Sequence, residues 1–201
     1  LVPSDGYKAR VPAGWLSLLV NAGDGIDLDV FLTRQPKDRM VRKLGQQLRI
    51  NRSKIKETSD TNTDFDDLDG AIRSGYFLKD GLSNNEDFYY LNLLITVTAG
   101  SVDDLEWKVA EMKKLLLSQD MDVQTCSFCQ EQAFLSSLPL VSLERQLYER
   151  SKRNVLTTGA ASCYPFTSYE MCDDNGILLG VNKHNNSLII VDIFDSRVYK
   201  N

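Results

Sequence analysis

Residues 88–98 constrain the fold most, because they predict one long β-strand. Side chains alternate along this segment, with Tyr89, Leu91, Leu93, Ile95 and Val97 on one face and Asn92, Thr96 and Thr98 on the other. A period of two is the period of a strand, and aromatic and β-branched residues favour that conformation. A second run, residues 26–32, alternates apolar with acidic residues and predicts a strand with one face in solvent.

Two helices are predicted between these strands. Pro36 suits the first position of a helix over residues 36–56, in which Met40, Leu44 and Leu48 recur every four residues. Residues 65–82 have helical spacing as well, and Gly81 suits the C-terminal end of that helix. Residues 59–63 are rich in Ser, Thr and Asn and predict a loop between the helices.

A third helix is expected after residue 101. Ser101 with Asp104 three residues later has the spacing of a capping box, and an apolar stripe follows at Leu105, Val109, Met112 and Leu116. Residues 122–128 predict another short strand. The order predicts an α+β fold that is roughly ferredoxin-like, with helices on one face of a mixed or antiparallel sheet.

The C-terminal part predicts a β-hairpin. Two apolar runs, residues 176–182 and 187–194, are joined by a polar tetrapeptide in which Asn tolerates the positive φ of a tight turn. The second run is almost unbroken apolar, which is typical of a strand covered on both faces. His184, the single histidine of the sequence, falls in this turn, where exposure is expected rather than metal ligation.

Composition places the chain among ordinary globular proteins. It has 201 residues, of which 42% are hydrophobic and 25% charged, and its formal net charge is −5. Its apolar runs are far shorter than the roughly 20 residues that a transmembrane helix needs. The chain begins at Leu1 without a Met or a signal-peptide pattern, so it reads as a segment of a longer protein.

Four cysteines allow three interpretations. Cys126 and Cys129 form a Cys-x-x-Cys, whereas Cys163 and Cys172 are nine residues apart and far downstream. This spacing differs from that of a zinc ribbon, so unremarkable thiols are favoured, and a metal site and a redox pair stay open. No metal-binding residue is predicted, and the acidic cluster around residues 64–69 lacks the Gly and Glu of a calcium-binding loop.

Basic residues dominate the first predicted helix. The candidate partner-binding face comprises Lys37, Arg39, Arg42, Lys43, Arg49 and Arg52. A basic helix beside an acidic loop is most often a solvated, partly self-paired surface, but it can also face anionic lipid or nucleic acid. The negative net charge, and the lack of aromatic residues in this segment, argue against strong nucleic-acid binding.

Several sequence words resemble one protein family in order and spacing. They are Gly14-Trp15, the segment QEQAFLSSLPL at residues 130–140, and the words TTGAASCYPFTSYEM, DDNGILLGVN and NNSLIIVDIF after residue 156. Together they resemble the conjugation ATPases of type IV secretion systems (the TraC/TrbE/CagE class), in the region that precedes the motor. The residues that carry the resemblance are Trp15, Gln132, Phe134, Leu138, Pro139, Pro165, Phe166, Gly176, Gly180, Asn182 and Asp192.

The resemblance implies a docking role. In that family the amino-terminal part attaches the motor to inner-membrane channel subunits and shapes its oligomer, while the carboxy-terminal part hydrolyses ATP with Mg²⁺. The implied location is the cytoplasm, at the inner face of the membrane. Residues 1–140 would then be a docking domain, 141–156 a helical linker and 157–201 the β-rich approach to the motor, with self-association a further expectation.

No chemistry is predicted for the chain itself. A phosphate-binding loop needs Lys and Ser or Thr after its glycines, and the nearest spacing, Gly70 to Gly75, is followed by Tyr76 and Phe77. No catalytic residue, acid–base pair or cofactor-binding residue is indicated. The alternative to the docking role is a stand-alone α+β binding module, with single-stranded nucleic acid as a possible ligand.

Overall fold

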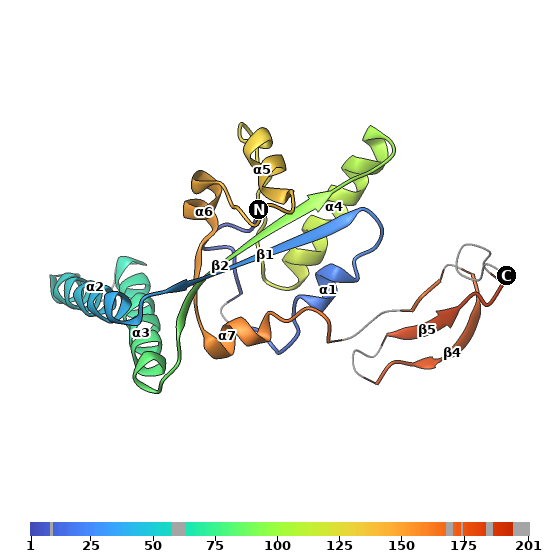
Figure 1. Cartoon of the computed structure of the whole chain (residues 1–201). Coiled ribbons are helices and arrows are strands. Elements are labelled where there is room, and N and C mark those ends of the chain that lie inside the picture. Colours follow the sequence, from blue (N-terminus) through green and yellow to red (C-terminus); the bar gives the residue numbers. More distant parts are fainter. Residues whose placement is uncertain (9, 58–62, 168–170, 174, 184–186, 195–201) are drawn as a thin grey trace.

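The chain folds around a three-stranded antiparallel sheet (Figure 1). The computed structural model describes residues 1–8, 10–57, 63–167, 171–173, 175–183 and 187–194. The sheet strands are β1 (Ile26–Gln35), β2 (Phe88–Val97) and β3 (Arg153–Leu156), in the order β1-β2-β3. The predicted α+β class is confirmed. Neighbouring strands are consecutive in sequence, so within the described residues the sheet lacks the interleaved strand order of the split βαβ unit.

Strand β2 forms the centre of the sheet. It pairs along its whole length with β1, from Gln35 opposite Phe88 to Ile26 opposite Val97, and its first four residues also pair with β3. Both of its edges are therefore paired at that end, and most of its residues are buried, with buried residues on both faces. Asn92, which lies on the predicted polar face, is therefore not in contact with solvent: its side chain is fully buried.

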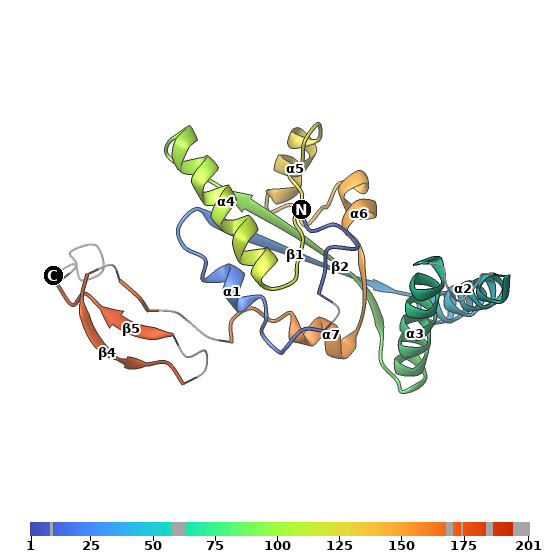
Figure 2. The ribbon, with the colours of Figure 1, turned by 180° about the vertical axis from the view of Figure 1, so that it is seen from behind.

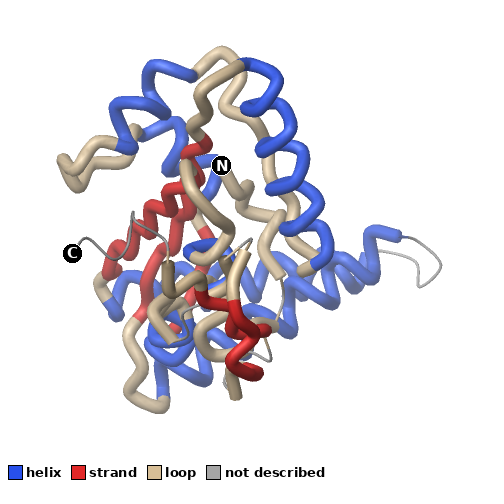
Figure 3. The backbone as a smooth tube through the Cα atoms, turned by 90° about the vertical axis from the view of Figure 1, so that its right-hand side faces the viewer, coloured by secondary structure: helices blue, strands red, loops and turns tan. Residues whose placement is uncertain are grey.

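Helices cover both faces of the sheet, and not one face as the sequence predicted (Figure 3). One face packs against α1 (Ser17–Val20) and α4 (Val102–Ser118), through Leu19, Met112 and Leu116. The other face packs against α5 (Gln130–Ser137) and α6 (Arg145–Ser151), with Leu94 and Leu147 at its centre. Both layers are needed because β2 carries apolar side chains on both faces.

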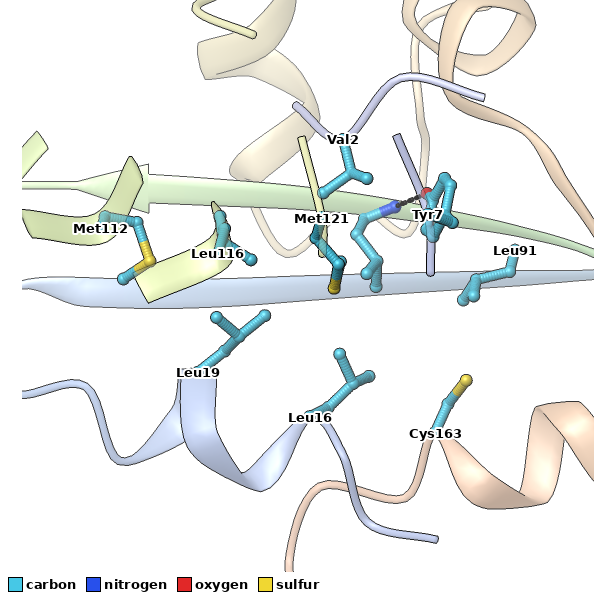
Figure 4. Packing of buried hydrophobic residues seen from close by; sticks show 10 residues of the cluster. Val2, Tyr7, Leu16, Leu19, Leu91, Met112, Leu116, Met121 and Cys163 are labelled. Carbon is cyan, nitrogen blue, oxygen red and sulfur yellow. Dashed lines mark hydrogen bonds between the residues drawn. The ribbon is translucent and has the colours of Figure 1, made fainter. Parts of the chain in front are cut away.

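The core between the sheet and the α1–α4 layer also holds two residues of the N-terminal segment (Figure 4). Val2 and Tyr7 pack there against Leu91, Leu93 and their neighbours. The Tyr7 hydroxyl accepts a hydrogen bond from the Leu93 amide at 3.1 Å. Because that hydroxyl is buried, the pKa of Tyr7 is raised well above its ordinary value. The N-terminal segment thus satisfies backbone groups of β2 beyond the end of β3.

A helical arm replaces the turn between β1 and β2. It consists of α2 (Lys37–Glu57) and α3 (Thr63–Ser83), which protrude from one end of the sheet (Figure 1). Met40, Leu44 and Leu48 are buried, as their spacing predicts. A Cβ atom on Gly75 would lie 2.8 Å from Leu48 Cδ2, so this glycine permits the close approach of the two helices. Most of the loop predicted at 59–63 lies outside the described residues, and Thr63 begins α3.

Two local predictions are wrong. Residues 122–128 form no strand, since the amides of Asp122 and Gln124 bond only to carbonyls of Gly6 and Leu1, and a turn follows at 127–128. Helix α3 continues past Gly81 to Ser83, and the left-handed residue after it is Asn85, with φ of 66°. Asn is the non-glycine residue best suited to that conformation.

The C-terminal hairpin is confirmed, with strands β4 (Ile177–Val181) and β5 (Leu188–Val191) in an antiparallel pair. It lies at the opposite end of the molecule from the arm (Figure 2). The expectation that its second strand is covered on both faces is not met, because Leu188 and the following Phe194 are exposed, as is most of β4. No other described layer packs over it. The proposed turn residue His184 lies outside the described residues.

Residues 141–156 belong to the packing of the main sheet. Helix α6 buries Leu147 completely, and β3 continues the sheet beyond β2. Helix α7 (Thr157–Ser162) follows directly, and Cys163 enters the core beneath α1. The segment expected to act as a linker therefore supplies a helix and a strand of the central fold.

Replacing Ser101 by alanine is expected to lower the free energy of unfolding by about 1 kcal/mol. The Ser101 hydroxyl accepts a hydrogen bond from the Asp104 amide at 3.2 Å, which satisfies one of the free amides at the start of α4. Chemical denaturation measures the difference. Ser137→Ala, at the end of α5, is the control, and an equal loss in both variants would argue against a capping role.

Candidate partner-binding surface on the helical arm

The candidate surface lies on α2, the first helix of the arm. Helix α2 contains eight basic residues and two acidic ones. Its apolar stripe packs against α3, and most of its described charged side chains are exposed to solvent. All six predicted residues lie on this helix, and all except the half-buried Lys37 are exposed. We call these six residues the basic face.

The basic face is not neutralised by the acidic part of α3. Among the described residues, none of its six side chains forms an ion pair with a carboxylate. Asp69 of α3 instead pairs with Arg73 of the same helix at 2.5 Å. The self-paired interpretation of this charge pattern therefore finds no support in the described part of the arm.

Several side chains of the basic face are oriented by neutral acceptors. Arg42 Nε donates to the Asp38 carbonyl at 3.3 Å, and Arg49 Nε donates to the Gly45 carbonyl at 3.2 Å. Each of these bonds uses one nitrogen of a guanidinium that offers five N–H donors. The others stay available, so Arg42 and Arg49 can still bind a carboxylate or phosphate in the two-pronged manner that arginine favours.

Helix α3 adds an aromatic residue that the sequence did not connect with this surface. Arg52 Nη1 donates to the Tyr76 hydroxyl at 3.2 Å, and Tyr76 is 46% exposed. The next residue, Phe77, is 69% exposed. Arg52 and Tyr76 are 24 positions apart, which hides this contact in the sequence. Only the antiparallel packing of two helices with apolar stripes could have indicated it.

At the base of the arm, two lysines surround Tyr90. Lys43 Nζ donates to the Tyr90 hydroxyl at 3.4 Å, and Lys152 Nζ lies 5.6 Å from the centre of the same ring. Tyr148 packs edge-on against Tyr90, with ring centres 6.1 Å apart. Burial, and then the proximity of Tyr90, raises the pKa of Tyr148. Glu149 pairs with Lys152, which lowers the pKa of that carboxyl.

The residues that carry the family resemblance do not form one site. Trp15 packs against the core between the sheet and the α1–α4 layer. The residues from Gln132 to Pro139 lie in α5 and directly after it, and those from Gly176 to Asp192 lie in or beside the hairpin. Phe134 and Phe166 are exposed at 64% and 70%. Gly180 lies at a register shift in β4, and a Cβ atom on Gly176 would collide with the backbone of Val191. The Asn182 amide donates to the Ser187 carbonyl at 2.8 Å, and Asp192 follows β5.

A groove that the sequence did not indicate lies between α1 and α4. Its volume is about 540 Å³, and Leu18, Ile26, Met112 and Leu115 supply apolar lining. The exposed Trp107 also lines it. Helical spacing predicted the apolar stripe of α4 that packs on the sheet. It did not indicate the groove, because Trp107 and Leu115 lie outside that stripe.

Within the described residues, no group of three or more His, Cys, Asp or Glu side chains is placed to hold a metal ion. No described helix is long and apolar enough to cross a membrane.

Comparison with known proteins found no matching family model, no matching curated protein and no matching solved structure.

Proposed function

We propose that this chain is the docking and assembly part of a conjugation-type secretion ATPase, and that the basic face of the arm binds acidic segments of the inner-membrane channel subunits. The observation that carries the proposal is a protruding helix on which none of the six basic-face side chains forms an ion pair with a carboxylate of the described residues. The sequence words that resemble the family supply the identity of the parent, and ATP and Mg²⁺ would act in its motor.

Geometry supports a role in protein binding. The arm extends from the sheet on two helices of 21 residues each, so its outer surface can reach a partner without disturbing the core. Exposed arginines speed encounter with an acidic partner and restrict its choice, more than they add affinity. The exposed hairpin at the other end fits the expectation that further sheet of the parent protein packs there.

Charge reversal tests the proposed role of the basic face. The double variant Arg42→Glu, Lys43→Glu is expected to bind about tenfold more weakly to inner-membrane vesicles that contain the secretion channel. Co-sedimentation at low salt measures this loss, and circular dichroism checks that the fold is intact. Binding of the unaltered chain is expected to fall at high salt, because exposed charges are screened.

The matched control is Lys113→Glu, Lys114→Glu, which makes the same change of charge on α4. It is expected to leave vesicle binding unchanged. If both double variants lost the same amount of vesicle binding, net charge alone would explain the effect, and a specific role of the basic face would be contradicted. If the unaltered chain bound equally well to vesicles without the channel, a protein partner would be contradicted.

A second candidate function is the binding of single-stranded nucleic acid by the arm. The contact between Arg52 and the half-exposed Tyr76 favours it, because cationic and aromatic side chains together bind phosphates and stack on bases. The net charge of −5 opposes it. Fluorescence anisotropy with a labelled single-stranded oligonucleotide separates the two functions. Only the nucleic-acid candidate predicts that the chain binds the oligonucleotide and that Tyr76→Ala weakens this binding.

A further inference from the structure

The Cys126–Cys129 pair lies in a tight turn at the start of α5. The Cys129 amide donates to the Cys126 carbonyl at 3.3 Å, which closes a four-residue turn. Such a turn brings its first and last Cα atoms within about 7 Å, and a disulfide needs a Cα separation of roughly 4.4 to 6.8 Å. The backbone therefore already holds the two cysteines near the separation that a disulfide requires.

The third residue of this turn is held in an unfavourable conformation. Phe128 has a φ of 63°, in the left-handed region that a bulky residue seldom adopts, and its side chain is fully exposed. Packing of the Phe128 side chain therefore does not stabilise this conformation. The fixed ends of the turn, at the two cysteines, hold it, which is how strained backbone persists in folded proteins.

The two sulfurs differ in access and surroundings. Cys126 is partly exposed, whereas Cys129 is 5% exposed and packs with Leu94 and Leu147. Arg150 Nη1 lies 4.0 Å from the Cys129 sulfur, so positive charge is adjacent to the buried member of the pair. Burial raises the pKa of Cys126, the nearby amino group of Leu1 opposes this increase, and the Cys129 side chain adds to it. The partly exposed Cys126 thiol can meet an external reagent, whereas the buried Cys129 thiol is shielded from one.

We propose that Cys126 and Cys129 form a reversible dithiol–disulfide site that reacts with low-molecular-weight disulfides such as oxidised glutathione. The Cys126 thiolate attacks the reagent, forms a mixed disulfide and releases one reduced thiol. The Cys129 thiolate then attacks the Cys126 sulfur, which forms the Cys126–Cys129 bond and releases the second thiol. Two cysteine thiols are oxidised, one reagent disulfide is reduced to two thiols, and the protons of the cysteines pass to the released thiolates.

The remaining described cysteines do not compete for this pairing. Cys163 is buried in the core on the other face of the sheet, and Cys172 is exposed next to the hairpin. The Cys172→Ser chain therefore gives a clean background, in which Cys126 is the most accessible thiol. An internal disulfide in this background reports on the turn alone.

The test is equilibration of the folded Cys172→Ser chain with mixtures of reduced and oxidised glutathione, followed by alkylation, mass spectrometry and peptide mapping. The expected product has lost two hydrogen atoms, carries no glutathione, contains the Cys126–Cys129 link and is restored by dithiothreitol. Persistence of a glutathione adduct on Cys126, or reaction only in denaturant, would overturn the proposal.

Two further variants assign the roles of the sulfurs. Cys129→Ser is expected to accumulate a stable glutathione adduct on Cys126, because the second step is blocked. Cys126→Ser is expected to stay unmodified while folded. Circular dichroism establishes that each variant is folded. If a variant fails to fold, peptide mapping of the Cys172→Ser chain still tests the proposal, because that chain retains both Cys126 and Cys129.

Discussion

Replacing Phe88 by alanine is expected to lower the free energy of unfolding by about 3–5 kcal/mol. Phe88 is fully buried at the first position of β2, where the arm meets the sheet. It packs with Met40 and Leu44 of α2 and with Leu78 and Leu82 of α3, and its ring meets Tyr90 edge-on at 5.6 Å. Truncation of Phe88 would leave a cavity between α2, α3 and β2 that the surrounding side chains cannot fill.

Urea denaturation and thermal melting measure this effect. A domain of this size loses about 2–4 °C of melting temperature per kcal/mol, so the expected decrease is roughly 6–20 °C. Phe77→Ala is the matched control, because Phe77 is 69% exposed on α3, and its expected change is within about 0.5 kcal/mol. If the Phe88 variant lost no more stability than this control, the base of the arm would not be the packed junction described above.

The substitution Asn92→Asp is expected to cost about 3–5 kcal/mol at neutral pH. Asn92 is fully buried in β2, and its Nδ2 donates to the Tyr148 carbonyl at 3.0 Å and to the Ser151 hydroxyl at 2.7 Å. These bonds attach α6 to the sheet. An aspartate would place a carboxylate oxygen against that carbonyl, so it would add a buried charge and remove two donated hydrogen bonds.

The pH dependence separates these two costs. Burial raises the pKa of a carboxyl in the folded state above its unfolded value of about 3.9. Below that unfolded value the carboxyl is neutral in both states, so the charge adds no cost. As pH rises, the unfolded chain ionises first and the variant loses stability, until the pH passes the folded pKa. The deficit relative to the parent chain should therefore be smaller at about pH 4 than at pH 7.

Asn154→Asp is the control for this prediction. Asn154 lies opposite Tyr90 in the same sheet, but it is exposed in β3. Its expected effect is small at both pH values. A deficit in the Asn92 variant that does not change with pH would show that the lost hydrogen bonds, and not the charge, account for the cost.

Local patterns predicted the elements well where the interactions are local. The capping serine Ser101 and the stripe of Met40, Leu44 and Leu48 need only neighbours within one or two turns, so their spacing identified α4 and α2. Alternation identified β2 for the same reason, and the two apolar runs near the end identified β4 and β5. The strand predicted at 122–128 was wrong, because local sequence does not reveal whether a partner strand is available.

The candidate surface was predicted in part. The six basic residues follow from the sequence because one helix presents them all. Tyr76, in contrast, joins Arg52 only through the packing of α3 on α2, and the turn geometry of Cys126 and Cys129 follows from hydrogen bonds that spacing alone does not fix.

The sequence by itself determined the α+β class, the main helices, the two long strands and the basic character of α2, since each depends on periodicity or on nearby residues. The tertiary structure decided that both sheet faces are covered, that Asn92 is buried, and that residues 145–156 complete the central fold. The physical reason is that burial and pairing depend on which distant segments meet, and β2 contacts segments as far apart as Tyr7 and Ser151.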